Sequence, residues 1–180
     1  MIQEPTLRAR DGESGSTLIE VLIATTILTV ALVGLAQAFV LGVTHSAVSQ
    51  NNLIAREKAR EAVESVHTAR DTRTITWAQI RNVADGGVFL DGAQPLHQAG
   101  ADGLINTDDA PDALEVIGPG ADGLLGTDDD QRGVGFQREI IIEDVAGSPA
   151  LRRLTIVITY PVSGLRPPPF RLVTFVSSFS

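Results

Sequence analysis

Residues 15–43 read GSTLIEVLIATTILTVALVGLAQAFVLGV, and this stretch decides the fold. No Asp, Glu, Lys or Arg occurs from Val21 to Ala55, and only Gln37 interrupts the apolar and small residues between Val21 and Val43. A helix rises about 1.5 Å per residue, so such a run can cross a hydrocarbon layer about 30 Å thick. The sequence therefore predicts a helix embedded in a membrane or in the core of a filament.

The composition of the whole chain excludes several functions. Cysteine is absent, which removes thiolate catalysis, disulfides and thiolate metal sites. The formal net charge is −8 over 180 residues, without any cluster of Lys and Arg, so we expect no nucleic-acid binding. Ser, His and Asp residues show no ordered catalytic arrangement. We therefore expect a protein that is not an enzyme.

The residues in front of the apolar run are polar and end at Gly15. They include Arg8 and Arg10, and no small-residue cleavage site follows Val43, unlike the order in a secretory signal peptide. Any processing is thus expected before the run. Glu20 lies near its start, where an unpaired carboxylate is unfavourable in lipid and is by default a functional residue. The alternative is a carboxylate at headgroup level that stabilises the helix N-terminus.

The segment from Gly15 to Ala24 resembles the prepilin signature of type IV pilins and type II secretion pseudopilins. This resemblance implies that prepilin peptidase cuts between Gly15 and Ser16 and methylates the new N-terminus. It also implies that Glu20, the fifth mature residue, pairs with the N-terminal ammonium of a neighbouring subunit during assembly. Ser16 departs from the phenylalanine usual in the family, which makes methylation less certain than cleavage.

The function implied by the resemblance is that of a structural subunit, of the minor kind, in a type IV pilus or type II secretion pseudopilus. The implied partners are prepilin peptidase, other pilin or pseudopilin subunits, an inner-membrane assembly platform and, before assembly, membrane lipid. The implied location is the inner membrane, with a single pass, a cytoplasmic N-terminus and an extracytoplasmic C-terminal domain. The alternative function is a bitopic membrane-anchored calcium-dependent binding domain that does not polymerise.

The predicted fold class is α+β, with a long N-terminal helix packed on a small antiparallel β-sheet. Apolar positions continue with helical spacing from Ala55 to Ala69, so we expect one helix from about Thr17 to about Ala69, apolar all round at first and amphipathic later. Alternating and β-branched residues predict three strands. They cover Phe136–Val145, Arg153–Tyr160 and Arg171–Phe179.

The predicted organisation has five segments. They are a leader peptide (1–15), a transmembrane or filament-core helix (16–45), the amphipathic second half of the helix with a connector (46–80), an acidic loop region (81–134) and the antiparallel sheet (135–180). Arg152 and Arg153 are expected to form a solvated pair at the start of a strand.

The acidic loop region contains a repeat with a period of twenty residues. Gly100–Asp109 recurs as Gly120–Asp129 with eight of ten positions identical, and no Lys or Arg occurs between Asn82 and Gln131. The register resembles the second half of an EF-hand calcium loop, but the first-half ligands are missing. The repeat is therefore either a Ca²⁺ site, shared or completed by carbonyl groups, or a plain acidic surface loop. The candidate ligands are Asp102, Asn106, Asp108, Asp109, Asp122, Asp128, Asp129 and Asp130.

Overall fold

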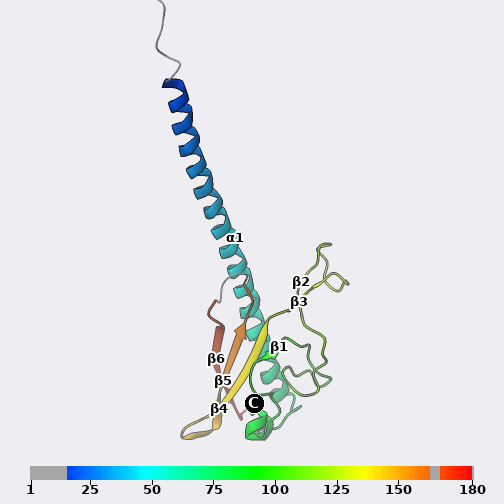
Figure 1. The fold of residues 1–180 in the computed structure, drawn as a ribbon. Helices are drawn as coiled ribbons and strands as arrows, with labels where there is room; N and C mark the ends of the chain where they lie inside the picture. Colours follow the sequence, from blue (N-terminus) through cyan, green and yellow to red (C-terminus); the bar gives the residue numbers. More distant parts are fainter. Residues whose placement is uncertain (1–15, 163–166, 180) are drawn as a thin grey trace, which may run out of the picture. The chain divides into compact units, whose positions relative to one another are not determined.

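The computed structural model describes residues 16–162 and 167–179, and the chain divides into two compact units, Met1–His45 and Ser46–Ser180. Helix α1 (Ser16–Asp71) begins in the first unit and continues into the second (Figure 1). Both ends of α1 lie within two residues of the predicted ones. The α+β class, with one long helix packed on a small antiparallel sheet, is confirmed.

The first unit exposes every side chain from Thr17 to Val43. This part of α1 is long and apolar enough to cross a membrane, by length and composition. Several of its threonine hydroxyls donate to carbonyl groups one turn earlier, so these hydroxyls present no free donor to an apolar surrounding. The hydroxyls that do so are those of Thr25, Thr26, Thr29 and Thr44.

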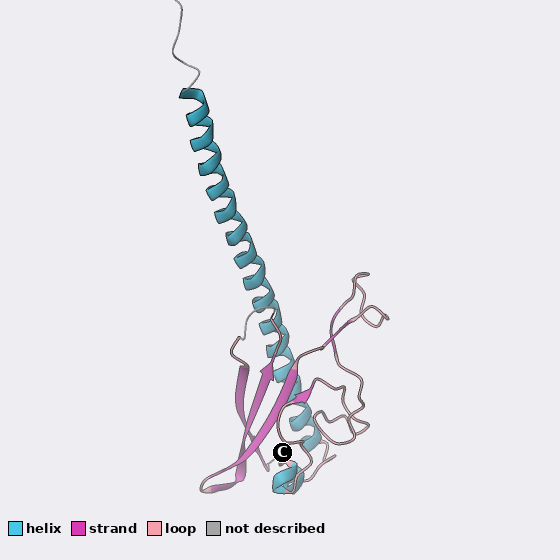
Figure 2. Cartoon of the chain, viewed as in Figure 1, coloured by secondary structure: helices cyan, strands magenta, loops and turns pink. Residues whose placement is uncertain are grey.

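The second unit contains an antiparallel sheet with the strand order β1-β4-β5-β6 (Figure 2). The strands are β1 (Gln94–Pro95), β4 (Gln137–Val145), β5 (Ser148–Thr159) and β6 (Phe170–Ser177). The three predicted strands are confirmed. Strand β5 begins five residues before the predicted Arg153, because Ala146 and Gly147 alone make the turn and Val145 pairs with Ser148. Gly147 has φ +76°, which glycine adopts without a steric penalty.

The acidic loop region contains only short elements. Strands β2 (Val116–Gly118) and β3 (Gln131–Arg132) pair with each other and carry the second repeat between them, and two short 3₁₀ helices, η1 (Trp77–Gln79) and η2 (Val83–Asp85), follow α1. These elements, like β1, were not predicted, because two or three residues show no periodicity.

The hydrophobic core lies where the amphipathic half of α1 meets the sheet. The predicted stripe on the helix is buried, apart from Val63, which is partly buried. Alanine dominates this stripe. The buried helix residues are Ala55, Ala59, Ala62, Val66 and Ala69, and those of the sheet include Ile140, Leu154, Ile156, Ile158 and Val176.

The prediction of a solvated arginine pair is wrong for Arg152. Its side chain is buried, its guanidinium donates to Asp144 at 3.0 Å and to the carbonyl groups of Ile80 and Trp77, and it stacks 4.2 Å from the Trp77 ring centroid. Arg152 shares the inward face of β5 with Leu154, so the period-two pattern contained the signal. Its hydrogen bond holds the pKa of Asp144 below the usual value, with a further contribution from Arg81.

Overfilling the alanine stripe tests this packing. We expect Ala59→Leu to lower the free energy of unfolding by about 1–3 kcal/mol, because the added methyl groups have no space against the sheet. Ala47→Leu is the matched control, because Ala47 lies on α1 in the same unit but is exposed, and it should change stability by less than about 0.5 kcal/mol. Urea unfolding of the full chain in detergent, followed by circular dichroism, measures both; equal effects would contradict the helix–sheet contact.

Candidate functional site

The predicted processing residues lie at the start of α1. Gly15 is outside the described residues, and Ser16 is the first residue of the helix. Glu20 follows one turn later and is exposed. Its carboxylate makes no hydrogen bond or ion pair with any residue in the described ranges 16–162 and 167–179. A carboxylate in this position is therefore available to a group outside this chain.

The two acidic repeats form the same tight turn. In the first repeat (residues 100–109), Asp102 Oδ1 accepts a hydrogen bond from the backbone N–H of Leu104 at 2.8 Å. In the second repeat (residues 120–129), Asp122 Oδ1 accepts one from Leu124 at 2.9 Å. Aspartate side chains stabilise turns in this way.

The end of each turn is also shared. The hydroxyl groups of Thr107 and Thr127 each donate to an aspartate two residues later, Asp109 or Asp129, at 2.8 Å. This hydrogen bond, together with a backbone donor from Asp122, holds the pKa of Asp129 below its usual value. Each turn also contains two residues with positive φ, which are Gly103 and Asn106 in the first repeat and Gly123 and Gly126 in the second. The repeated sequence thus encodes a repeated structure.

The surroundings of the two repeats differ. Leu104 and Ile105 of the first repeat are 1% and 3% exposed and belong to the core, and Ser65 on α1 donates a hydrogen bond to the carbonyl of Gly103. The corresponding Leu124 and Leu125 of the second repeat are 63% and 69% exposed. The same turn is therefore packed into the core in one copy, whereas in the other Leu125 only lines an open pocket with Ile54, Glu57 and Lys58 of α1.

A buried ionic network holds the first repeat in place. Arg138 on β4 is fully buried and donates to Glu115 Oε1 at 2.9 Å and to Asn106 Oδ1 at 2.9 Å. Asn106 returns a hydrogen bond to the carbonyl of Arg138 at 3.0 Å. Sequence reasoning placed Asn106 among calcium ligands; in this structure its side-chain oxygen already accepts from Arg138.

The network extends to α1 through Lys58. Its ammonium lies 2.8 Å from Glu115 Oε2 and 2.8 Å from Glu61 Oε2. Burial alone would lower the pKa of Lys58, but its hydrogen bonds to Glu115 and Glu61 outweigh burial and raise it. Sequence reasoning missed Lys58, Glu115 and Arg138. Only Arg138 carried a signal, since it shares the inward face of β4 with Ile140.

The remaining predicted ligands lie at the surface, with one exception. No group of three or more His, Cys, Asp or Glu side chains among the described residues converges in a way that could hold a metal ion. Asp108 and Asp128 are exposed. Asp130 is 7% exposed; its Oδ2 accepts from the N–H of Gly126 at 2.8 Å, whereas its Oδ1 is buried without a hydrogen-bond partner. The Ca²⁺ assignment stays a prediction.

Comparison with known proteins identifies the N-terminal segment. Residues 10–36 match the family model of the prokaryotic N-terminal methylation motif, which is the signature of type IV pilins and pseudopilins. The chain therefore carries the N-terminal signal of this class, and the resemblance found in the sequence is confirmed. The motif implies processing by prepilin peptidase and assembly with other pilins in general. No curated protein and no solved structure gives a significant match to the chain.

The buried network can be tested by removing its central cation. We expect Arg138→Met to lower the free energy of unfolding by about 3–5 kcal/mol, because it leaves Asn106 Oδ1 unsatisfied and Glu115 with Lys58 alone. Arg153→Met is the matched control: Arg153 pairs with Glu143 on the exposed face of the same sheet, and its loss should change stability by less than about 1 kcal/mol. The same urea unfolding measurement applies, and a loss at Arg138 no larger than at Arg153 would show that the network is dispensable.

Proposed function

We propose that this protein is a structural subunit of a type IV pilus or type II secretion pseudopilus, and not an enzyme. The observation that carries the proposal is the methylation motif at residues 10–36, which runs directly into a helix whose side chains from Thr17 to Val43 are all exposed. So much exposed apolar surface requires a cover. Lipid supplies it before assembly, and the helices of neighbouring subunits supply it in the filament.

Glu20 gives this helix a means of alignment. In the proposed assembly its carboxylate pairs with the N-terminal ammonium that cleavage between Gly15 and Ser16 creates on a neighbouring subunit. An acid among apolar helices needs such a partner, because an unpaired buried charge is strongly unfavourable. The absence of any partner for Glu20 among the described residues supports this role.

The proposal also covers the location of the protein before assembly and its status as a minor subunit. Before assembly the chain spans the inner membrane once through residues 16–45, with a cytoplasmic N-terminus, and an assembly platform then transfers it to the filament. The small size of Ser46–Ser180 and the serine at the first mature position support a minor subunit. The competing function is a membrane-anchored binding domain that does not polymerise, and a plain anchor has no need of Glu20.

Intact mass spectrometry of the membrane-extracted chain tests the processing step. We expect a chain that begins at Ser16, with or without the mass of one methyl group. We expect Glu20→Leu to be cleaved and inserted normally but to be absent from filaments, because the alignment pair is lost. Gln37→Leu is the matched control, since it also replaces a long polar side chain of α1 by leucine but keeps Glu20.

Two outcomes would contradict the proposal. A chain still beginning at Met1 in cells that contain the peptidase would exclude prepilin processing. Normal incorporation of Glu20→Leu into filaments would favour the anchored binding domain.

We further propose that the second repeat, together with Asp130 directly after it, binds Ca²⁺. The supporting observation is Asp130, whose buried Oδ1 has no hydrogen-bond partner and follows directly on Asp128 and Asp129. Ca²⁺ accepts carboxylate, carbonyl and water oxygens in flexible geometry, so main-chain carbonyl groups and water can complete a shell.

Thermal unfolding of the full chain in detergent, in CaCl₂ and in EDTA, tests this site. A ligand that binds only the folded chain stabilises it by about 1.4 kcal/mol at a free concentration ten times Kd, so we expect Tm to rise with Ca²⁺. Asp130→Asn should abolish the rise. Asp112→Asn, at an exposed aspartate outside both repeats, should keep it. An unchanged Tm of the unsubstituted chain would identify the repeats as plain acidic loops.

A further inference from the structure

The second repeat presents an apolar pair that nothing in its own unit buries. Leu124 and Leu125 are 63% and 69% exposed, and the same turn carries the exposed residues Asp122, Asp128 and Asp129. The repeat lies between β2 and β3, which form a sheet separate from β4–β6. Figure 1 shows this β2–β3 arm standing away from the other strands of the unit. Two adjacent exposed leucines at the end of an arm are a surface that a partner can cover.

The first repeat shows how such a turn docks. It has the same turn geometry, and it buries Leu104 and Ile105 in the core next to α1, where Ser65 donates to the carbonyl of Gly103. The turn therefore fits a surface made of a helix and its neighbouring elements. The chain itself contains one buried example. In the second repeat Leu125 borders an open pocket beside Ile54 of α1, but the leucine pair stays exposed.

A groove of the complementary kind lies between α1 and β6 on the same unit. This α1–β6 groove has a volume of about 480 Å³. Its apolar residues are Val63, Leu172 and Val173, and Val173 is 49% exposed. Strand β6 is an edge of the sheet, so its outer backbone groups also lack a strand partner. The groove is lined by Arg60, Val63, Glu64, His67, Leu172, Val173 and Thr174.

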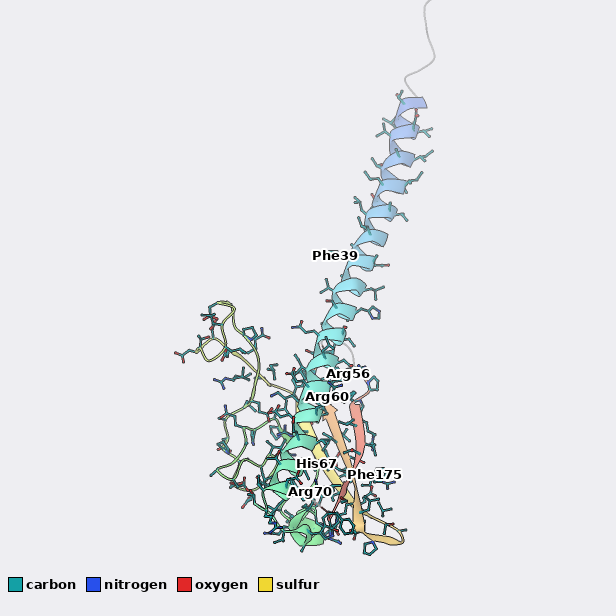
Figure 3. All side chains as sticks on the ribbon, turned by 180° about the vertical axis from the view of Figure 1, so that it is seen from behind. Phe39, Arg56, Arg60, His67, Arg70 and Phe175 are labelled. Atoms are coloured by element: carbon teal, nitrogen blue, oxygen red, sulfur yellow. The ribbon has the colours of Figure 1, made fainter. Side chains whose placement is uncertain are left out.

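The charges around the groove complement those of the second repeat. Arg60 at the groove and Arg171 on β6 make no ion pair with any residue in the described ranges, although Glu64 is nearby on α1. Arg56, one turn before Arg60, donates a hydrogen bond to the neutral Asn52 and lies over the ring of Phe170, and it forms no ion pair with the described residues. Figure 3 shows Arg56, Arg60 and His67 one after another along α1. The groove region of one copy thus carries arginines without an ion pair among the described residues, and the second repeat carries the exposed carboxylates of Asp122, Asp128 and Asp129.

We propose that Leu124 and Leu125 of one copy dock into the α1–β6 groove of a second copy of this chain, with Asp122 and Asp128 next to Arg60 of that copy. This inference rests on the proposed function, because it names the surfaces through which neighbouring subunits touch outside the helix bundle. It concerns only residues of Ser46–Ser180, and does not involve Glu20.

The positions of the two surfaces suit a filament. Figures 1 and 3 both place the β2–β3 arm and β6 on opposite sides of the α1 segment in this unit, so one copy offers an arm on one side and a groove on the other. A contact between two different surfaces is heterologous, and heterologous contacts that do not close into a ring propagate as helical filaments. Each copy can therefore bind one neighbour with its arm and receive another in its groove.

The absence of native cysteine allows a direct test by cross-linking. One tagged full-length chain carries Leu125→Cys and a second, with a different tag, carries Val173→Cys; both are produced in the same cells, and the membranes and filaments are oxidised in EDTA. We expect a mixed disulfide dimer about tenfold more abundant than with Val83→Cys as the second chain, since docking raises the local concentration of the paired thiols. Val83 is the matched control because it is also an exposed valine, 49% accessible like Val173, but does not line the groove.

Charge reversal provides a second, independent test of the proposed contact. Arg60→Glu in the Val173→Cys chain should reduce the mixed dimer several-fold, and Asp128→Arg in the Leu125→Cys chain should restore it. Arg73→Glu, at another arginine that forms no ion pair with the described residues, should have no effect. Dimers at the level of the Val83 control, or dimers insensitive to Arg60→Glu, would overturn the proposal.

The same samples separate this inference from the proposed function, because their mass spectra report cleavage after Gly15 and their filament fraction reports assembly. Processed and assembled chains without the mixed dimer overturn the docking alone. Unprocessed chains that still form the dimer support the docking and overturn the pilin assignment. Unprocessed chains without the dimer overturn both.

Discussion

The fully buried guanidinium of Arg138 is the constraint on which the second unit depends. A charge inside a protein must be paired and hydrogen-bonded, and here Glu115, Asn106 and a carbonyl group of the acidic loop region meet that requirement. Because Glu115 also pairs with Lys58, the same ions join the loop region to β4 and to α1. This explains how a segment of about fifty residues with almost no regular secondary structure keeps a fixed position on the sheet.

Regular elements could be predicted because their periods are visible in the sequence. The run from Val21 to Val43 gave the apolar helix, the spacing from Ala55 to Ala69 gave the buried stripe, and alternation around Ile156 gave β5. The predicted exposure of Arg152 is wrong because its position on the inward face of β5 buries the side chain, although a charged residue is usually exposed. The network around Arg138 depends on contacts between residues more than twenty positions apart, and no local pattern reports such contacts.

The candidate sites also divide into those with a local sequence pattern and those that only the fold reveals. The predicted processing residues and Glu20 belong to one continuous stretch of chain, and the methylation motif matches that stretch. The acidic repeats could be found as sequence, but not their roles. Hydrogen bonds within each turn already engage Asp102, Asp122 and Asp129, and only the fold shows that one copy is buried and the other exposed.

The two copies of the repeated turn tolerate substitutions to different degrees. The copy at residues 100–109 is bound by the requirements of the core, so changes to Leu104 or Ile105 destabilise the domain. The copy at residues 120–129 keeps the same backbone scaffold but is released from those requirements. Its apolar and acidic side chains can vary without unfolding the chain. The chain thus holds one copy of the turn that the core constrains and one copy that a protein engineer can alter independently of the core.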